Sequence, residues 1–292
     1  MRAATATADH AFTNFHIQPL TSTLGASIEG LDLSKPLLPK EISAIRRALM
    51  CHEVLFFEDQ MLTPAQLRDF ASCFGELHVH PIRPHVMEVP EVALLQNQWA
   101  VDDSGNWRAD VTFIDTPPMG CLLYAEHVPA TGGDTVWAST RVAFDALSQT
   151  VKNFLTPLIA SHDFERSYTE ARFRRMDLSS ERFAWARRDH PPTTHPVVRT
   201  HPETGLDSLF VNPAFTTAIL GLNPSESRKL LDLIFDHIQQ PQFQVRRQWK
   251  PGTLAFWDNR VTQHYTVADY AAAERVMYRV TILGDKPFHR PG

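Results

Sequence analysis

The chain reads Asn106-Trp107-Arg108-Ala109-Asp110-Val111-Thr112-Phe113 at one point and Gln263-His264-Tyr265 far downstream. Residues spaced i and i+2 on a strand point to the same side, so Arg108 and Asp110 are predicted to share a face. With a distant histidine, such a face can form a mononuclear metal site that leaves positions open. Asp110 and His264 are ligand-type residues, but Arg108 is cationic and has no lone pair to offer a metal. Taken singly, the aspartate fits a turn or an ion pair equally well, and a lone histidine is more often a core or surface residue than a ligand.

The composition is that of an ordinary globular protein. Of 292 residues, 43% are hydrophobic and 21% are charged, which is ample material for a core. The net charge of −5 gives no electrostatic reason to expect nucleic acid or a membrane surface as partner. The three cysteines, Cys51, Cys73 and Cys121, do not predict a disulfide framework. No signal-peptide pattern and no membrane-spanning apolar run is present, so we expect a soluble cytoplasmic protein.

The hydrophobic pattern predicts many short strands with few helices. Short strands are predicted within 17–33 and at 54–57, 120–125, 134–138, 243–249, 253–258 and 275–283, and helices at 40–50, after Thr63 and after Asn223. This pattern favours a mainly β fold, a sandwich or jelly roll with flanking helices, in one domain over residues 15–292. Residues 1–14 are small and polar and are predicted to be flexible. Residues 160–195, rich in charge and aromatics, are predicted to form a helical or irregular, lid-like excursion.

Several blocks of the sequence occur in one family in the same order and at the same spacing. They are residues 106–113, Thr131-Gly132-Gly133-Asp134-Thr135, Trp257-Asp258-Asn259-Arg260, residues 263–265 and residues 275–281. From about residue 15 to residue 291, the chain resembles the taurine dioxygenase (TauD/TfdA) family. The resemblance implies a double-stranded β-helix (jelly roll) that holds Fe(II) and 2-oxoglutarate and uses O₂. It also implies oxidation of a small sulfonate or similar anion with decarboxylation of 2-oxoglutarate to succinate, in a dimer or tetramer.

By matching position, Asp110 and His264 are the implied metal ligands. Arg275 and Thr135 are implied to bind the distal carboxylate of 2-oxoglutarate, a role that suits a planar guanidinium. The alternatives are a surface ion pair between Arg275 and Glu274 and, for Thr135, a plain strand threonine.

The resemblance also implies a substrate site. Arg279 matches the residue that binds the sulfonate of taurine, and His80 matches its helper. Four further positions are expected to line the substrate's carbon skeleton: Val111, Phe113, Tyr168 and Phe215. Core packing is the alternative for the aromatic residues.

Arg108 departs from the family pattern, which has a histidine ligand there. It either pairs with Asp110 in a site that no longer binds iron, or swings away while Asp110, His264 and 2-oxoglutarate hold a weakened metal. As a third possibility, it is a natural or engineered variant of an ordinary dioxygenase. The alternative function is therefore a metal-impaired, non-catalytic or weakly active homologue. A weaker rival is a two-ligand enzyme with altered chemistry, such as halogenation.

A second departure concerns the substrate. Arg83 stands where taurine-specific relatives carry an aromatic hydroxyl, and Ser104 replaces an amide near the amine end of the ligand. We therefore expect an anion other than taurine; the alternative is that Arg83 points to solvent.

Overall fold

A computed structural model of the chain describes residues 15–79, 85–96, 105–270 and 274–290. The predicted flexible segment 1–14 and the candidate residues His80, Arg83 and Ser104 lie outside these ranges. No helix within them is long and apolar enough to cross a membrane.

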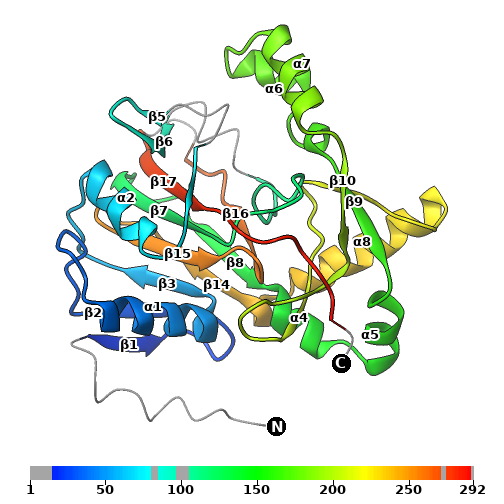
Figure 1. The fold of residues 1–292 in the computed structure, drawn as a ribbon, viewed down its shortest axis with the longest axis horizontal. Coiled ribbons are helices and arrows are strands. Elements are labelled where there is room, and N and C mark those ends of the chain that lie inside the picture. Colours follow the sequence, from blue (N-terminus) through cyan, green and yellow to red (C-terminus); the bar gives the residue numbers. More distant parts are fainter. Residues whose placement is uncertain (1–14, 80–84, 97–104, 271–273, 291–292) are drawn as a thin grey trace.

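A large sheet forms one wall of the fold (Figure 1). Its strands are, in spatial order, β1 (His16–Pro19), β2 (Ala26–Glu29), β3 (Val54–Phe57), β15 (Leu254–Asp258), β7 (Gly120–His127), β17 (Val276–Ile282), β6 (Val89–Gln96) and β5 (His85–Val86), with β4 (Leu77–His78) paired to β17. The predicted strand at 54–57 is confirmed as β3, and all four of its side chains are fully buried. A continuous apolar run suits a strand that is covered on both faces.

A smaller sheet packs against this wall. It consists of β14 (Gln244–Arg247), β8 (Thr135–Ser139) and β16 (Thr262–Thr266), in that spatial order. The core between the sheets is rich in aromatic rings: Trp137 of β8 lies 5.3 Å from Phe56 and 5.8 Å from Trp257, centroid to centroid. The predicted strands at 134–138 and 253–258 therefore face each other across the core, and β16 carries His264.

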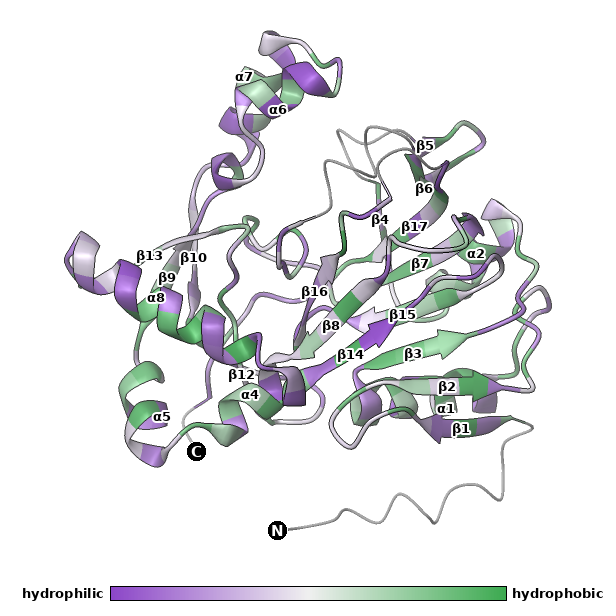
Figure 2. Ribbon diagram, turned by 180° about the vertical axis from the view of Figure 1, so that it is seen from behind, coloured by the Kyte–Doolittle hydropathy of each residue, from purple (hydrophilic) through white to green (hydrophobic). Residues whose placement is uncertain are grey.

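Helices cover the outer face of the large sheet, where α1 (Pro39–His52) contacts β3 and β15, and α2 (Pro64–Ser72) contacts β6 and β17. Figure 2 shows the hydrophobic colouring of β3 beside α1. The predicted helix start after Thr63 is confirmed, because the Thr63 hydroxyl accepts from the Gln66 amide and the Gln66 side chain accepts from the Thr63 amide. Asn223 and Glu226 form the same capping box at the start of α8 (Pro224–Ile238), which confirms the predicted helix after Asn223.

A second layer packs beside the smaller sheet. Its elements are α4 (Thr140–Ala146), α5 (Gln149–Leu155), α8, β11 (Val198–Thr200) paired with β12 (Asp207–Leu209), the short helix η2 (Pro241–Phe243), and a sheet of β10 (Thr193–Pro196), β9 (Ile159–His162) and β13 (Thr216–Ile219).

The excursion predicted at residues 160–195 leaves through β9 and returns through β10. Between them lie η1 (Phe164–Arg166), α6 (Glu170–Arg175) and α7 (Ser180–Asp189). Figures 1 and 2 show α6 and α7 standing away from the two sheets. The helices agree with the prediction, but both ends of the excursion are strands. The sequence pattern missed these strands because they contain polar residues that are nevertheless buried, such as His162 and His195.

Candidate active site around Asp110

Arg108 forms an antiparallel bridge with His264 of β16, an edge strand of the smaller sheet, and Asp110 follows in a turn. The backbone N–H of Arg108 donates to the carbonyl of His264 (3.0 Å), and the His264 N–H donates in return (2.8 Å). Residues 110–113 then form a turn, so the predicted strand through Asp110 is wrong. The cause is a distant side chain: Asn259 accepts from the Asp110 amide (2.7 Å) and donates to the Asp110 carbonyl (3.0 Å).

The turn contains a strained residue. Val111 has a φ of 54°, in the left-handed region that a β-branched side chain rarely adopts. Such a conformation costs about 1–3 kcal/mol and persists where surrounding contacts impose it. The Asn259 clamp on Asp110 supplies such contacts on one side of Val111.

The carboxylate of Asp110 is buried among cations. Its Oδ2 lies 2.5 Å from Nη2 of Arg279 and 3.6 Å from Nε2 of His264, and its Oδ1 lies 3.4 Å from Nε of Arg108. Burial by itself would raise the pKa of Asp110, but the charges of Arg279, His264 and Arg108 outweigh it and hold the pKa below its ordinary range. Asp110 is therefore ionised at neutral pH.

These contacts decide between two interpretations of Arg108. The side chain of Arg108 is buried, with the residue 9% exposed, and it faces Asp110. It therefore pairs with Asp110 as the first interpretation expects, and it does not extend into solvent.

The residues present do not fit the Fe(II) that the resemblance implies. Asp110 and His264 do meet, but the third position of the set is the cationic Arg108, which cannot ligate a metal. Within the described residues, no group of three or more His, Cys, Asp or Glu side chains is placed to hold a metal ion. The arrangement is suited to holding anions, because its guanidinium groups are buried donors.

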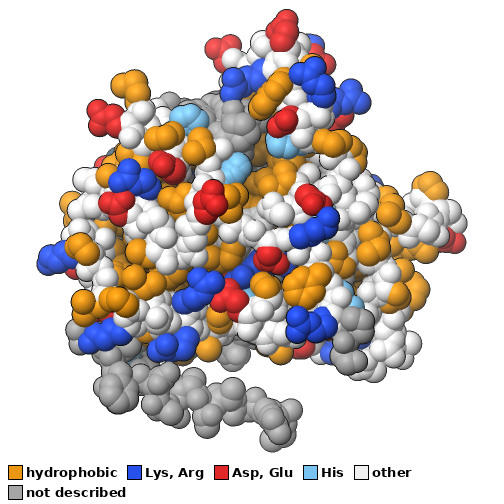
Figure 3. Space-filling view, in the orientation of Figure 1, with side chains coloured by type: hydrophobic (Ala, Val, Ile, Leu, Met, Phe, Trp, Pro, Cys, Tyr) orange, Lys and Arg blue, Asp and Glu red, His pale blue; other side chains and the backbone are white. Residues whose placement is uncertain are grey.

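A cavity opens beside this cluster. It is lined by His78, Arg108, Asp110, Val111, Tyr168, Phe215, Arg279 and Thr281. The structure thus brings four of the predicted substrate residues together with the Arg108–Asp110 pair: Val111, Tyr168, Phe215 and Arg279. Figure 3 shows hydrophobic side chains and histidines gathered below the excursion on this face of the molecule.

Two lining residues, His78 and Thr281, were missed by sequence reasoning. Thr281 lies two residues after Arg279 on β17, so the period-two rule applied to Arg279 would have found it. His78 lies in β4, which pairs with β17 at Thr281, and burial followed by the charge of Arg279 lowers its pKa. His78 is therefore a neutral, polar part of the lining.

Phe113 is not among the cavity-lining residues. Its ring packs 5.0 Å from Phe215 and 5.3 Å from Phe164, centroid to centroid, in an aromatic cluster under the excursion. For Phe113 the structure supports the core-packing alternative, and its contact with Phe215 supports the cavity wall from behind.

The predicted cosubstrate residues lie elsewhere on the two facing sheets. Arg275 immediately precedes β17, and at 4% exposure it contradicts the alternative of a surface ion pair. Its guanidinium lies 5.0 Å from the ring centroid of Tyr270. The Thr135 hydroxyl accepts from the indole N–H of Trp249 (2.9 Å). Gly133 has a φ of +70°, and a Cβ there would approach the Tyr270 ring, so glycine suits this close-packed turn.

A buried histidine pair contacts the turn at residues that follow Val111, whereas Asn259 contacts it before Val111. His195 Nε2 contacts two carbonyl oxygens, Thr112 O at 2.9 Å and Ile114 O at 3.1 Å, so this nitrogen carries the proton and donates. His162 Nδ1 lies 3.0 Å from the Thr112 hydroxyl. Burial lowers the pKa of His195 to about 4, with the charge of Arg199 lowering it further and Asp115 opposing. Burial, then the neighbouring His195, holds the pKa of His162 well below 6.5.

We expect His195 to make stability depend on pH. Its folded pKa is depressed to about 4 from 6.5, so between these values the unfolded chain binds more protons. The contribution of His195 to the free energy of unfolding is then complete above about pH 6.5 and falls by about 3 kcal/mol as the pH drops to about 4.

The measurement is urea unfolding of the wild type and His195→Gln across this range. The advantage of the wild type should shrink on acidification. Glu53, whose pKa is raised to about 7 by burial, acts oppositely but equally in both proteins. A pH-independent difference between the two proteins would contradict the assignment.

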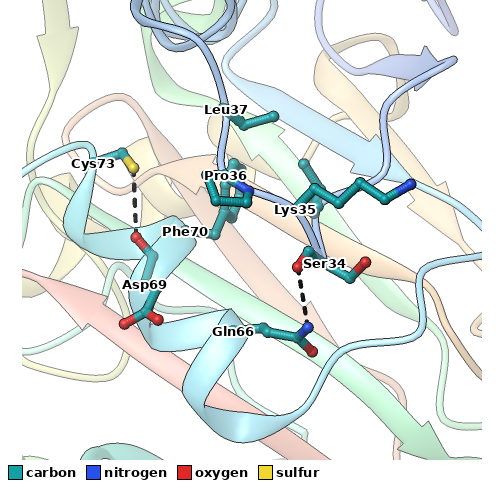
Figure 4. A pocket seen from close by; sticks show the side chains of 9 residues that line it. Ser34, Lys35, Pro36, Leu37, Gln66, Asp69, Phe70 and Cys73 are labelled. Carbon is teal, nitrogen blue, oxygen red and sulfur yellow. Dashed lines mark hydrogen bonds between the residues drawn. The ribbon is translucent and has the colours of Figure 1, made fainter.

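A separate pocket lies between residues 33–37 and α2 (Figure 4). In it, the Gln66 side chain donates to the Ser34 carbonyl (3.0 Å), and the Cys73 thiol contacts the Asp69 carbonyl (3.4 Å). The cation at this pocket, Lys35, is exposed and paired with Asp32 (2.8 Å). No residue predicted for the site lies here, so the pocket around Asp110 remains the candidate.

Comparisons with known proteins agree with the resemblance. The family described as "Taurine catabolism dioxygenase TauD, TfdA family" matches residues 16–281. An alkylsulfatase of Acinetobacter baylyi is 34% identical over 274 residues, which covers 92% of this chain and 85% of that protein. An alpha-ketoglutarate-dependent sulfate ester dioxygenase of Pseudomonas putida is 35% identical over 291 residues, covering 98% of this chain and 94% of that protein.

The fold is also similar to solved structures. The crystal structure of a taurine dioxygenase from Burkholderia xenovorans matches with a TM-score of 0.81 at 35% identity, covering 94% of this chain and 91% of that one. The likeness confirms the predicted mainly β fold with a jelly-roll core.

Proposed function

The chain belongs to the TauD, TfdA family of 2-oxoglutarate (alpha-ketoglutarate)-dependent dioxygenases, and we propose that its site takes a small sulfate ester, sulfonate or similar organic anion. Oxidation of this anion is coupled to decarboxylation of 2-oxoglutarate to succinate, the reaction class of the family.

The observation that carries this proposal is the composition of the cavity. Arg279 places a guanidinium at its polar end, while Val111, Tyr168 and Phe215 supply apolar walls. An organic anion needs both: charge-assisted hydrogen bonds for its head and apolar contact for its carbon skeleton. Arg279 also binds Asp110, and its Nη2 donates to the Cys121 thiol (3.2 Å), so the anion would share this guanidinium with the two protein partners.

Arg275 supports the cosubstrate half of the proposal. A buried guanidinium beside Tyr270 and the Gly132-Gly133 turn is suited to a dicarboxylate, since bidentate pairing with a carboxylate is strong and directional. Fe(II) is the metal that the family uses for this reaction, and we assign it no step here because the Arg108 position does not fit it.

A second candidate function is a metal-impaired, weakly active or non-catalytic homologue. The specific observation in its favour is the buried pair between Arg108 and Asp110. Such a protein would bind 2-oxoglutarate and the organic anion and release them with little turnover.

Binding and turnover measured together test the proposal. Titration calorimetry should show 2-oxoglutarate binding to the chain, weakened about 100-fold in Arg275→Leu, which corresponds to roughly 2.7 kcal/mol of charge-assisted hydrogen bonding. Arg228→Leu is the matched control, because Arg228 is exposed and pairs with the exposed Asp232 on α8. Succinate formation with iron supplied should be faster with alkyl sulfates or amine-free sulfonates than with taurine. Fastest turnover with taurine would overturn the substrate assignment, and absence of 2-oxoglutarate binding would overturn the function.

A further inference from the structure

Two buried histidines lie at the base of the excursion, in the strands where it leaves and returns. His162 ends β9 and His195 lies in β10, and the antiparallel register pairs Thr193 with His162 and His195 with Ala160. The two rings lie 5.0 Å apart, centroid to centroid, and the residues are 0% and 1% exposed. Both strands at the base of the excursion thus present a histidine to the interior.

Both histidines contact the turn that carries Asp110. His195 donates from Nε2 to the carbonyl oxygens of Thr112 and Ile114, and His162 Nδ1 shares a hydrogen bond with the Thr112 hydroxyl. The same hydroxyl accepts from the amide of Asn212 (2.9 Å). Thr112 is therefore held through its backbone carbonyl by His195 and through its hydroxyl by His162 and Asn212.

The turn is consequently clamped on both sides of its strained residue. Asn259 fixes the backbone of Asp110, and the histidines fix Thr112, so Val111 lies between two clamps. A left-handed valine needs such support, because its conformation is intrinsically unfavourable. A shift of β9 and β10 would move one clamp relative to the other, and with it the Val111 side chain.

The excursion also supplies a wall of the cavity directly. Tyr168 follows η1 and lines the cavity together with Val111 of the turn, and its ring stacks on Phe164, 4.9 Å between centroids. The cavity is thus bounded by Val111 on the turn and Tyr168 on the excursion. The histidine pair lies in β9 and β10, the strands from which the excursion that carries Tyr168 leaves and to which it returns.

We propose that His162 and His195 are positioning residues that couple the placement of the excursion to the Asp110–Val111 turn and thereby set the shape of the substrate cavity. They act through Thr112 and Ile114 and touch no substrate. The claim about the cavity rests on the proposed function, whereas the mechanical coupling of the two segments does not.

Hydrogen–deuterium exchange of the full chain tests the coupling. His195→Phe keeps a ring beside Phe210 but removes the Nε2 donor, and His195→Gln keeps an amide donor near the same place. For His195→Phe we expect exchange to be about tenfold faster in residues 108–114 and in residues 163–192 together, and unchanged in β7 and β15. For His195→Gln we expect exchange rates close to those of the wild type. His237→Phe is the matched control, since His237 also donates from Nε2 to a backbone carbonyl, that of Ala143.

A ligand measurement separates positioning from plain stability. In His195→Phe the dissociation constant of an alkyl sulfate should rise several-fold, while that of 2-oxoglutarate, which we assign to Arg275, should stay as in the wild type. Thr112→Val provides a milder second variant that removes the hydroxyl contacts of His162 and Asn212, and it should show the same exchange pattern more weakly. Faster exchange confined to β10, or spread evenly over the chain, would overturn the proposal. Wild type that binds no alkyl sulfate would overturn the proposed function and leave the exchange result to decide the coupling.

Discussion

Replacing Arg108 with histidine is expected to raise the affinity of the site for Fe(II) by about a thousandfold and to increase succinate formation accordingly. Arg108 places its charge beside Asp110, where a metal would share the carboxylate with it. At about 4 Å and an effective dielectric near 20, each pair of unit charges repels by about 4 kcal/mol, so the dication is repelled by about 8 kcal/mol. Relief of only half of this repulsion corresponds to roughly three powers of ten in affinity. Histidine removes this repulsion and adds a neutral nitrogen ligand to Asp110 and His264.

Arg108→Gln is the control that separates charge from ligation. Glutamine removes the cation but supplies a weaker ligand than imidazole, so metal affinity should rise only partly. The measurements are metal content after dialysis against iron and succinate formed per hour by each variant. Equal metal content and turnover in the parent chain and in Arg108→His would rule out the idea that Arg108 disables the site.

Replacing Arg279 with leucine is expected to weaken anion binding strongly and to lower stability. Arg279 makes the shortest of the ion pairs to Asp110, 2.5 Å, and its charge is the largest of those that keep the pKa of Asp110 low. Removing one partner of a buried pair typically costs 3–5 kcal/mol, and here we expect about 3 kcal/mol because Arg108 still faces the carboxylate. Affinity for an alkyl sulfate should fall at least about 100-fold, since the head group loses its charge-assisted donors.

Arg279→Lys is the matched variant, which keeps the charge but loses the planar fork. It should retain most of the stability and recover only part of the affinity, because a single ammonium cannot make the paired hydrogen bonds. Urea unfolding and calorimetric titration read the two effects separately. Unchanged affinity in Arg279→Leu would place the anion elsewhere.

Much of the fold follows from local patterns. The capping residues Thr63 and Asn223 marked helix starts, and the apolar run 54–57 marked a strand buried on both faces. These features depend on neighbours within a few residues, which periodicity captures. The approximate location of the cavity followed from the resemblance, through Arg279, Val111, Tyr168 and Phe215.

The remaining features depend on contacts between distant segments. The turn at Asp110 exists because Asn259 clamps it across 149 residues, and no local pattern contains that information. The roles of His162 and His195 have the same origin, since both bind a turn more than 45 residues away. Whether Arg108 pairs with Asp110 or extends into solvent likewise depends on the burial of both side chains, which the local sequence does not show.

The Arg108–Asp110 pair has a consequence for how the charge of Asp110 is balanced. In a site that relies on a bound metal to neutralise its carboxylate, a newly synthesised polypeptide matures fully only when that metal is supplied. Here two guanidinium groups encoded in the chain itself neutralise Asp110. The charge of Asp110 is therefore balanced within the folded polypeptide by its own arginines, and this balance needs no metal ion.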